Sequence, residues 1–164
     1  MRDIGRMAMW SVSSAKPGNG VDKLLNDDNS TYWQSDGGPL HVNVQFLKKM
    51  RVQEVAIYLD FKLDESYTPM DISIWVGTSY ADLHRIAVRK LNEPTGWVTV
   101  TLASEGMPFV RANVLRLSVE ANHQCGRDCH IRQMRLFGPR QPFTASFNLP
   151  TFSTVDFSSL AVLR

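Results

Sequence analysis

Short runs of β-branched and aromatic residues recur along most of this 164-residue chain, and glycine, proline, asparagine and aspartate separate them. In residues 42–46 apolar and polar side chains alternate, which would place Val42, Val44 and Phe46 on one face of a strand. Residues 52–59 form a more continuous apolar run, typical of a central strand. Long segments with the period of a helix are missing. This pattern disfavours α and α/β architectures and predicts an all-β domain.

Further strands are predicted by the same criterion later in the chain. They comprise residues 72–76, 85–91, 97–102, 114–119 and 131–137. Ile131 and Met134 break the alternation of the last run, which indicates a bulge. About seven or eight short strands, spaced roughly 10 to 20 residues apart, favour a jelly-roll β-sandwich over a βαβ fold. Residues 21–25 are expected to form a short helix, and residues 79–83 a turn.

Two segments lie outside the strand pattern. Residues 60–69 read as a polar loop between two strands. Residues 139–164 contain three prolines, several serines and threonines and scattered phenylalanines, without the period of a helix or a strand. We therefore expect a sandwich domain over residues 1–138, followed by an extended tail over residues 139–164 that has no core of its own.

Charge and hydropathy exclude several classes of protein. The formal net charge is only +2, from 18 basic and 16 acidic residues, and no basic run is longer than Lys48-Lys49. A nucleic-acid-binding domain would need a concentrated basic surface, so nucleic acid is not an expected partner. No segment approaches the roughly 20 apolar residues that span a bilayer, and residues 1–10 do not resemble a secretory signal. With two cysteines, the chain is expected to be intracellular and reduced.

A cluster of potential metal ligands lies between residues 123 and 130, and it raises two chemical alternatives. His123, Cys125, Cys129 and His130 are residue types that bind zinc. However, Cys129 and His130 are adjacent, so their side chains would diverge if they begin a strand. A cysteine nucleophile with a histidine base is the second alternative, but no third orienting group is evident. A polar binding loop without metal, cofactor or catalysis is the preferred interpretation.

Residues 26–33 raise two further alternatives. The run Asn26-Asp27-Asp28-Asn29-Ser30-Thr31 offers oxygen ligands, but it lacks the spacing of a calcium loop, so local turns are expected. Tyr32 and Trp33 could line a sugar site, or Trp33 could fill the core. A lectin-like carbohydrate-binding module is therefore the rival hypothesis that the residues themselves leave open.

Several motifs, in order, resemble the DOC-domain family of anaphase-promoting complex subunits. They are Trp10-Ser11-Val12-Ser13-Ser14, Lys16-Pro17-Gly18, Gly20-Val21-Asp22, Thr31-Tyr32-Trp33-Gln34-Ser35-Asp36-Gly37, Asp64-Glu65-Ser66-Tyr67-Thr68-Pro69, Gly96-Trp97, Ala121-Asn122-His123-Gln124 and Gly126-Arg127-Asp128. The match runs from about residue 2 to residue 137 and resumes at Asp156-Phe157. Several motifs in register are far more specific than one short motif.

The resemblance implies a galactose-binding-like jelly roll and a non-catalytic role in a ubiquitin ligase of the nucleus and cytoplasm. Such a subunit binds the destruction box of substrates together with a WD40 coactivator, and it makes ubiquitination more processive. Carried over by motif, the degron-binding residues are Ser66, Tyr67, Thr68, Asn122, His123, Cys125, Arg127, Asp128 and His130. The terminal Leu163-Arg164 is implied to anchor the tail to a TPR-repeat scaffold subunit.

The chain departs from the family pattern at two places. Cys125 and Cys129 stand where the family has asparagine and threonine, and Cys125 thereby replaces an amide with a weak donor and acceptor. The tail ends in Leu163-Arg164 instead of Ile-Arg, a change that keeps the apolar volume and is expected to cost at most about 1 kcal/mol of docking free energy.

Overall fold

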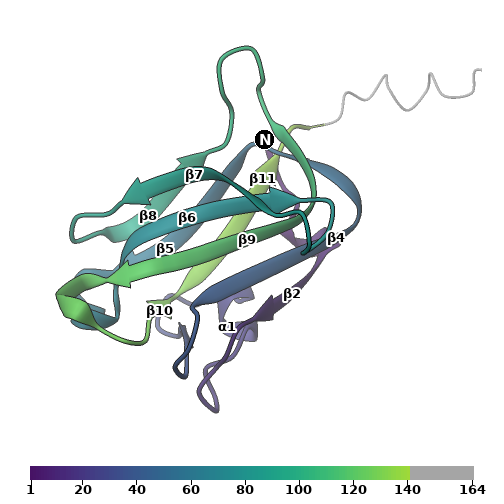
Figure 1. Ribbon diagram of the computed structural model, residues 1–164. Coiled ribbons are helices and arrows are strands. Elements are labelled where there is room, and N and C mark those ends of the chain that lie inside the picture. The colour runs from purple at the N-terminus through teal and green to yellow at the C-terminus, as the bar shows by residue number, and fades with distance from the viewer. Residues whose placement is uncertain (141–164) are drawn as a thin grey trace, which may run out of the picture.

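Two antiparallel sheets pack face to face in residues 1–140, the part of the chain that the computed structural model describes (Figure 1). The first sheet consists, in spatial order, of β2 (Ala8–Val12), β4 (His41–Val52), β9 (Val110–Asn122), β6 (Pro69–Gly77) and β7 (His84–Lys90). The second consists of β1 (Arg2–Asp3), β11 (Gln133–Gly138), β5 (Glu54–Asp60) and β8 (Thr95–Thr101). A small third ladder pairs β10 (His130–Ile131) with β3 (Trp33–Gln34). The predicted all-β sandwich is confirmed.

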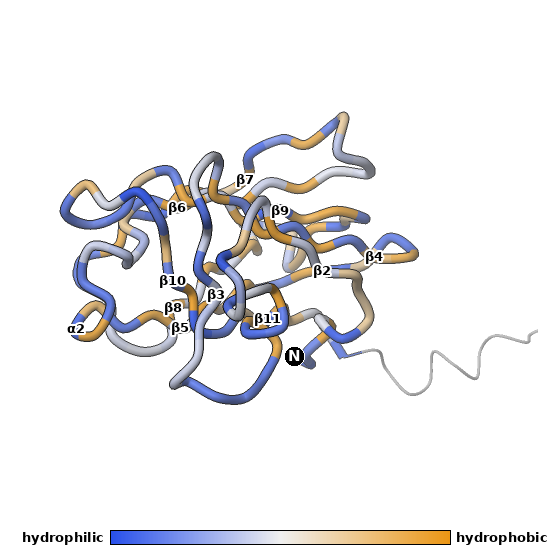
Figure 2. The backbone as a smooth tube through the Cα atoms, turned by 90° about the horizontal axis from the view of Figure 1, so that it is seen from below, coloured by the Kyte–Doolittle hydropathy of each residue, from blue (hydrophilic) through white to orange (hydrophobic). Residues whose placement is uncertain are grey.

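Alternation along the strands explains how the core forms. Val42, Val44 and Phe46 are almost fully buried against the second sheet, as the sequence predicts. Between them, Asn43 on the outer face accepts a hydrogen bond from Nε of Arg116 at 2.7 Å. Figure 2 shows the same alternation of hydrophobic and hydrophilic residues along the chain. The continuous apolar run of β5 fits its place between β11 and β8, inside its sheet.

The predicted strand over residues 131–137 is in fact two strands in different sheets. Residues 130–131 pair with β3, whereas residues 133–138 pair with β5 and β1. Arg132 lies between them, and its side chain turns to Asp64 and to the carbonyl oxygen of Asn29. The predicted bulge is therefore a change of sheet. Strands β1, β2 and β3 were not predicted, because they are short or alternate weakly.

The predicted short helix and the predicted turn are confirmed, and one predicted loop is corrected. Helix α1 spans Asp22–Leu25, and residues 79–83 form a turn in which Oδ1 of Asp82 accepts backbone N–H groups at 2.9 and 2.8 Å. Residues 60–69, predicted to be a polar loop, contain α2 (Phe61–Asp64) and a 3-10 turn, η2 (Glu65–Tyr67). Asp60 caps α2 by accepting the N–H groups of its second and third residues.

The predicted domain boundary at residue 138 coincides with the end of β11. Most of the predicted tail, residues 141–164, lies outside the described residues, and so do Leu163 and Arg164. Within residues 1–140, no helix is long and apolar enough to cross a membrane.

Candidate functional site

Two segments that are distant in the sequence meet at one end of the sandwich. Residues 61–68 connect β5 to β6, and residues 123–130 run from the end of β9 into the first residue of β10; we call these two segments the paired loops. Strands β6 and β9 are antiparallel neighbours with Pro69 opposite Asn122, so both loops emerge at the same edge (Figure 1, left). The backbone N–H of His123 donates to the carbonyl oxygen of Thr68 at 2.9 Å and joins them directly.

The His123 ring adds two further bonds to this junction. Its Nδ1 lies 3.1 Å from the carbonyl oxygen of Thr68, and its Nε2 accepts the backbone N–H of Glu93 at 3.2 Å. A neutral ring protonated on Nδ1 satisfies both contacts. The ring also packs against Phe61 and is buried. His123 therefore holds three segments together and does not face solvent.

Asn122 organises the second loop from inside. Its Nδ2 donates to the carbonyl oxygens of Gly126 at 3.1 Å and Asp128 at 3.0 Å. Between them the chain turns sharply, with Gln124 and Cys125 in the left-handed region at φ of 55° and 59°. This single amide thus adds two hydrogen bonds to a turn in which the backbone N–H of Gly126 also donates to the carbonyl oxygen of His123 at 3.1 Å.

Gly126 fits where no other residue would. A Cβ atom at this position would lie 1.9 Å from the carbonyl oxygen of Ser66. Glycine therefore allows the backbones of the paired loops to touch.

Asp128 and Cys129 attach the loop to a third segment. Oδ1 of Asp128 accepts hydrogen bonds from Oγ of Ser35 at 3.1 Å and from the N–H of Gly37 at 2.8 Å. The N–H of Cys129 donates to the same Ser35 hydroxyl at 3.0 Å. Gly37 and Gly38 both have positive φ, a backbone conformation that favours glycine.

His130 lies at the centre of an aromatic stack. Its ring is sandwiched between Tyr32, at a centroid distance of 3.8 Å, and Tyr67, at 4.2 Å, with nearly parallel planes. Its Nδ1 lies 3.0 Å from Oδ1 of Asp64, whose carboxylate also receives two hydrogen bonds from Arg132, at 3.0 and 2.7 Å. Burial acts to raise the pKa of Asp64, but the His130 and Arg132 hydrogen bonds outweigh it, so this pKa lies below its usual value.

The predicted degron-binding residues thus divide by exposure. Tyr67, Cys125 and Arg127 are exposed, and Ser66 and Asp128 are half-buried. The remaining four are buried: Thr68, Asn122, His123 and His130. Within residues 1–140, five buried side-chain atoms have no hydrogen-bond partner, and three of them belong to this set: Oγ1 of Thr68, Oδ1 of Asn122 and Nε2 of His130.

Comparison with known proteins matches this chain to one family over nearly its whole length. The model of the family "Anaphase-promoting complex, subunit 10 (APC10)" matches residues 1–161. The anaphase-promoting complex subunit 10 of Drosophila melanogaster is 45% identical over 166 residues, which cover 100% of this chain and 85% of that protein. The chain belongs to the APC10 family. The human APC10 protein is 43% identical over 165 residues, which cover 100% of this chain and 89% of the human protein.

Membership of the APC10 family makes this chain a non-catalytic subunit of the anaphase-promoting complex, associated with its other subunits. Solved structures agree on the fold. The family 32 carbohydrate-binding module from C. perfringens NanJ, in complex with galactose, superimposes with a TM-score of 0.66 and 14% identity, covering 80% of this chain and 94% of that one. At that identity the match shows the galactose-binding-like fold alone.

The zinc and thiol-enzyme alternatives do not fit the APC10 site. The Cys129 side chain is fully buried in the core, and that burial raises the pKa of its thiol to about 12. His123 and His130 are engaged by protein groups, as described above. Among residues 1–140, no three His, Cys, Asp or Glu side chains are grouped to hold a metal ion.

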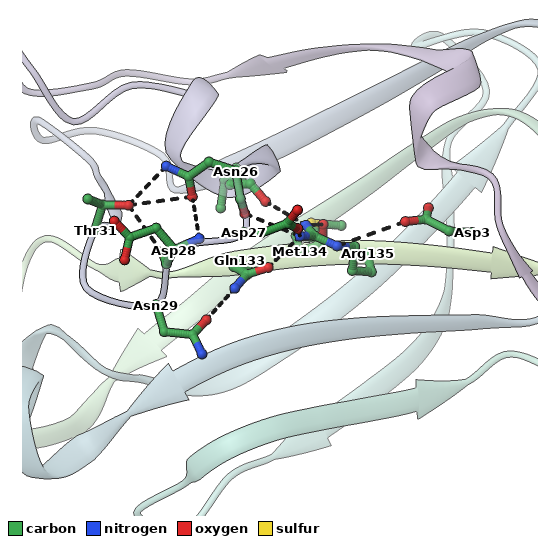
Figure 3. Close-up of polar contacts among 10 residues, drawn as sticks. Asp3, Asn26, Asp27, Asp28, Asn29, Thr31, Gln133, Met134 and Arg135 are labelled. Carbon is green, nitrogen blue, oxygen red and sulfur yellow. Dashed lines mark hydrogen bonds and ion pairs between the residues drawn. The ribbon is translucent and has the colours of Figure 1, made fainter.

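The calcium and sugar alternatives fail for similar reasons in this APC10 chain. Asn26 and Asp28 accept backbone N–H groups two residues ahead, as in the predicted turns, and Arg135 contacts Asp27 (Figure 3). Trp33 is fully buried, and its Nε1 donates to the carbonyl oxygen of Ser14 at 2.9 Å. Trp33 is therefore a core residue, which is the alternative that the sequence left open beside a sugar-binding role.

Three residues of the APC10 site were missed by sequence reasoning: Asp64, Arg132 and the stacking role of Tyr32. Asp64 is one carboxylate in a polar segment, and nothing in the local pattern distinguishes it from its exposed neighbours. Arg132 sits where a single strand with a bulge was predicted. Only the change of sheet at that position brings its guanidinium to Asp64.

Proposed function

We propose that this APC10 subunit binds the destruction box of substrates as a co-receptor with a WD40 coactivator, and so increases the number of ubiquitins added per encounter. The proposal adds a ligand and a role to the family membership established above. It assigns the paired loops as the degron-binding surface, with exposed Tyr67 and Arg127 in contact with the peptide.

The observation that carries the proposal is the concentration of unpartnered buried polar atoms in the paired loops and in Asn122, where β9 leads into the second loop. Buried polar groups in native proteins nearly always have hydrogen-bond partners, so exceptions gathered at one site are typical of a functional surface. Thr68, Asn122 and His130 each contribute one such atom. The exposed side chains of Tyr67 and Arg127 beside these atoms can hydrogen-bond to the backbone of an extended peptide.

The division between exposed and buried residues gives each a role. Ser66, Tyr67, Cys125, Arg127 and Asp128 form the accessible surface. The four buried residues keep the two loops in register through the bonds described above. Rigid support of this kind lowers the entropy lost when a peptide binds.

Bivalent binding explains how a small surface supports processivity. A contact made by two short loops is weak alone, but it becomes effectively intramolecular once a coactivator holds the same peptide. Slower substrate dissociation then permits more ubiquitin transfers before release. The subunit itself performs no chemistry in this scheme.

The test uses exposed residues, so that folding is preserved. Tyr67→Ala with Arg127→Ala removes exposed groups from the paired loops. Tyr80→Ala with Arg85→Ala is the matched control, because Tyr80 is 44% exposed, against 39% for Tyr67, and follows the opposite end of β6. Single-encounter ubiquitination of a destruction-box substrate by the reconstituted ligase should give shorter chains with the first variant only. Wild-type chain lengths from both variants would refute the assignment of the loops.

We also propose that Leu163-Arg164 anchors the subunit to a TPR-repeat scaffold subunit, in the nucleus and cytoplasm. An apolar side chain followed by a guanidinium suits a groove with an apolar pocket and an acidic wall. Affinity purification of the intact chain and of a chain lacking these two residues tests the anchor. Lower recovery of TPR-repeat subunits with the shortened chain is expected, and equal recovery would move the anchor to the sandwich.

A further inference from the structure

A second, strongly basic site lies at the opposite end of β9 from the paired loops. A pocket of about 230 Å³ is lined there by Arg2, Ile4, Lys48, Lys49, Met50, Arg51, Arg111 and Pro139. Arg111 is the second residue of β9 and Asn122 its last, so the two sites are separated by roughly 35 Å along the strand. In Figure 1 this is the end at which the N-terminus lies. Five of the eight lining residues are cationic, and none is acidic.

Two of the basic side chains lie directly opposite each other on neighbouring strands, a position that sheets usually avoid for like charges. Arg51 on β4 and Arg111 on β9 are directly opposite each other in the antiparallel ladder. Like charges in that position destabilise a sheet. Both guanidinium groups lie over the ring of Phe109, at 5.2 and 6.0 Å from its centroid, which holds them at the same place.

Nothing in residues 1–140 compensates this charge. The side chains of Arg2, Lys48, Lys49, Arg51 and Arg111 form no hydrogen bond or ion pair within those residues, whereas Arg132 and Arg135 are fully engaged. The Nε atom of Arg2 is in addition buried without a partner. A local conflict without internal compensation is expected where a surface serves a function.

We propose that this basic pocket binds an acidic segment of another subunit of the complex. Guanidinium groups bind carboxylates in paired, charge-assisted hydrogen bonds, and three arginines converge on one pocket. The adjacent Leu47, 91% exposed, would supply an apolar contact at the rim. Nucleic acid fits less well, because the positive charge is compact and the net charge of the chain is only +2.

A single charge reversal is expected to weaken binding of an acidic peptide without destabilising the fold. Arg51→Glu places a carboxylate opposite Arg111, which replaces a repulsive cross-strand pair with an attractive one. The melting temperature of the full-length chain should therefore stay the same or rise by roughly 1 to 4 °C. Fluorescence anisotropy with a labelled octaglutamate peptide should nevertheless show at least a tenfold weaker affinity than for the wild type.

Lys90→Glu is the matched control, because Lys90 is an exposed β7 residue outside the pocket and its reversal changes the net charge equally. It should keep wild-type affinity for octaglutamate. Equal affinities of the wild type and Arg51→Glu would overturn the proposal. A short single-stranded DNA that binds the wild type more tightly than octaglutamate would overturn it as well.

Zero-length carbodiimide cross-linking of the purified complex tests the partner directly. Lys48 and Lys49 should be joined to aspartate or glutamate of another subunit, and mass spectrometry identifies the linked peptide. Lys48→Arg with Lys49→Arg should remove these cross-links while preserving the charge. Cross-links from Lys90 to other subunits, with none from Lys48 or Lys49, would place the interface elsewhere and refute the inference.

Discussion

Nδ1 of His130 lies 3.0 Å from Oδ1 of Asp64, beneath the exposed ring of Tyr67. The same carboxylate receives two hydrogen bonds from Arg132. The buried Asp64 carboxylate therefore neutralises the buried Arg132 guanidinium and also orients the His130 imidazole. Tyr67 stacks on that imidazole, so the position of the Tyr67 ring depends on Asp64. The candidate site is built on this ionic centre.

Asp64→Asn should destabilise the domain by about 3 kcal/mol, because it leaves the Arg132 guanidinium buried without its counter-charge. Asp22→Asn is the control: its ion pair with Lys23, at 3.7 Å, lies at the surface with the carboxylate side chain 76% exposed, and it should contribute less than about 1 kcal/mol. Urea unfolding followed by circular dichroism measures both. Losses of similar size for the two variants would show that the ionic centre is not a stabilising element.

The same substitution predicts a pH dependence. The pKa of Asp64 is lower in the folded state than its unfolded value of about 3.9, so its contribution to stability is present above about pH 4. That contribution is lost as the pH falls through the folded pKa. The difference in unfolding free energy between wild type and Asp64→Asn should therefore be constant from pH 7 to 5 and shrink below about pH 4. A difference that grows on acidification would contradict the assigned pKa direction.

The sandwich was predictable because apolar and polar residues alternate along its strands, and this local pattern indicates which side chains are buried. Val42, Val44 and Phe46 needed no tertiary information to be placed in the core. Short strands such as β3 lack this signal, since two residues cannot alternate. The change of sheet at Arg132 could not be predicted either, because Arg132 binds Asp64, which lies about seventy residues earlier in the chain.

The candidate site was predictable by resemblance but not by local chemistry. The motifs around Ser66 and Asn122 identify the two loops, and the structure brings them together. The motifs do not tell which side chains are exposed: His123 and His130 look like surface ligands in the sequence, yet both are buried and bonded. Burial here follows from contacts between distant loops, which no local pattern contains.

Gly126→Ala should disrupt the junction between the loops, because the added methyl would meet the carbonyl oxygen of Ser66 at 1.9 Å. Separation of the loops should lower stability by roughly 1 to 3 kcal/mol and shorten ubiquitin chains in the single-encounter assay. Gly20→Ala is the matched control, since its Cβ would meet only the flexible end of Asp22 at 3.3 Å. Wild-type stability and chain length in Gly126→Ala would show that the close approach is dispensable.

The two cysteines should differ completely in reactivity. Cys125 is exposed on the tight turn of the second loop, whereas Cys129 is fully buried with a thiol pKa raised to about 12. Only a thiolate attacks a disulfide reagent, so at pH 8 the folded chain should release one equivalent of thionitrobenzoate from Ellman's reagent, and the denatured chain two.

Two variants assign the reactive thiol. Cys125→Ser should abolish the reaction of the folded chain, whereas Cys129→Ser should preserve it. Rapid modification of both thiols in the folded wild type would show that the second loop opens readily. Because Cys125 lies on the proposed degron surface, its modification should also shorten ubiquitin chains in the Cys129→Ser background, where no other thiol of this subunit is present. Full processivity after complete modification would remove Cys125 from the binding surface and leave the contact to Tyr67 and Arg127.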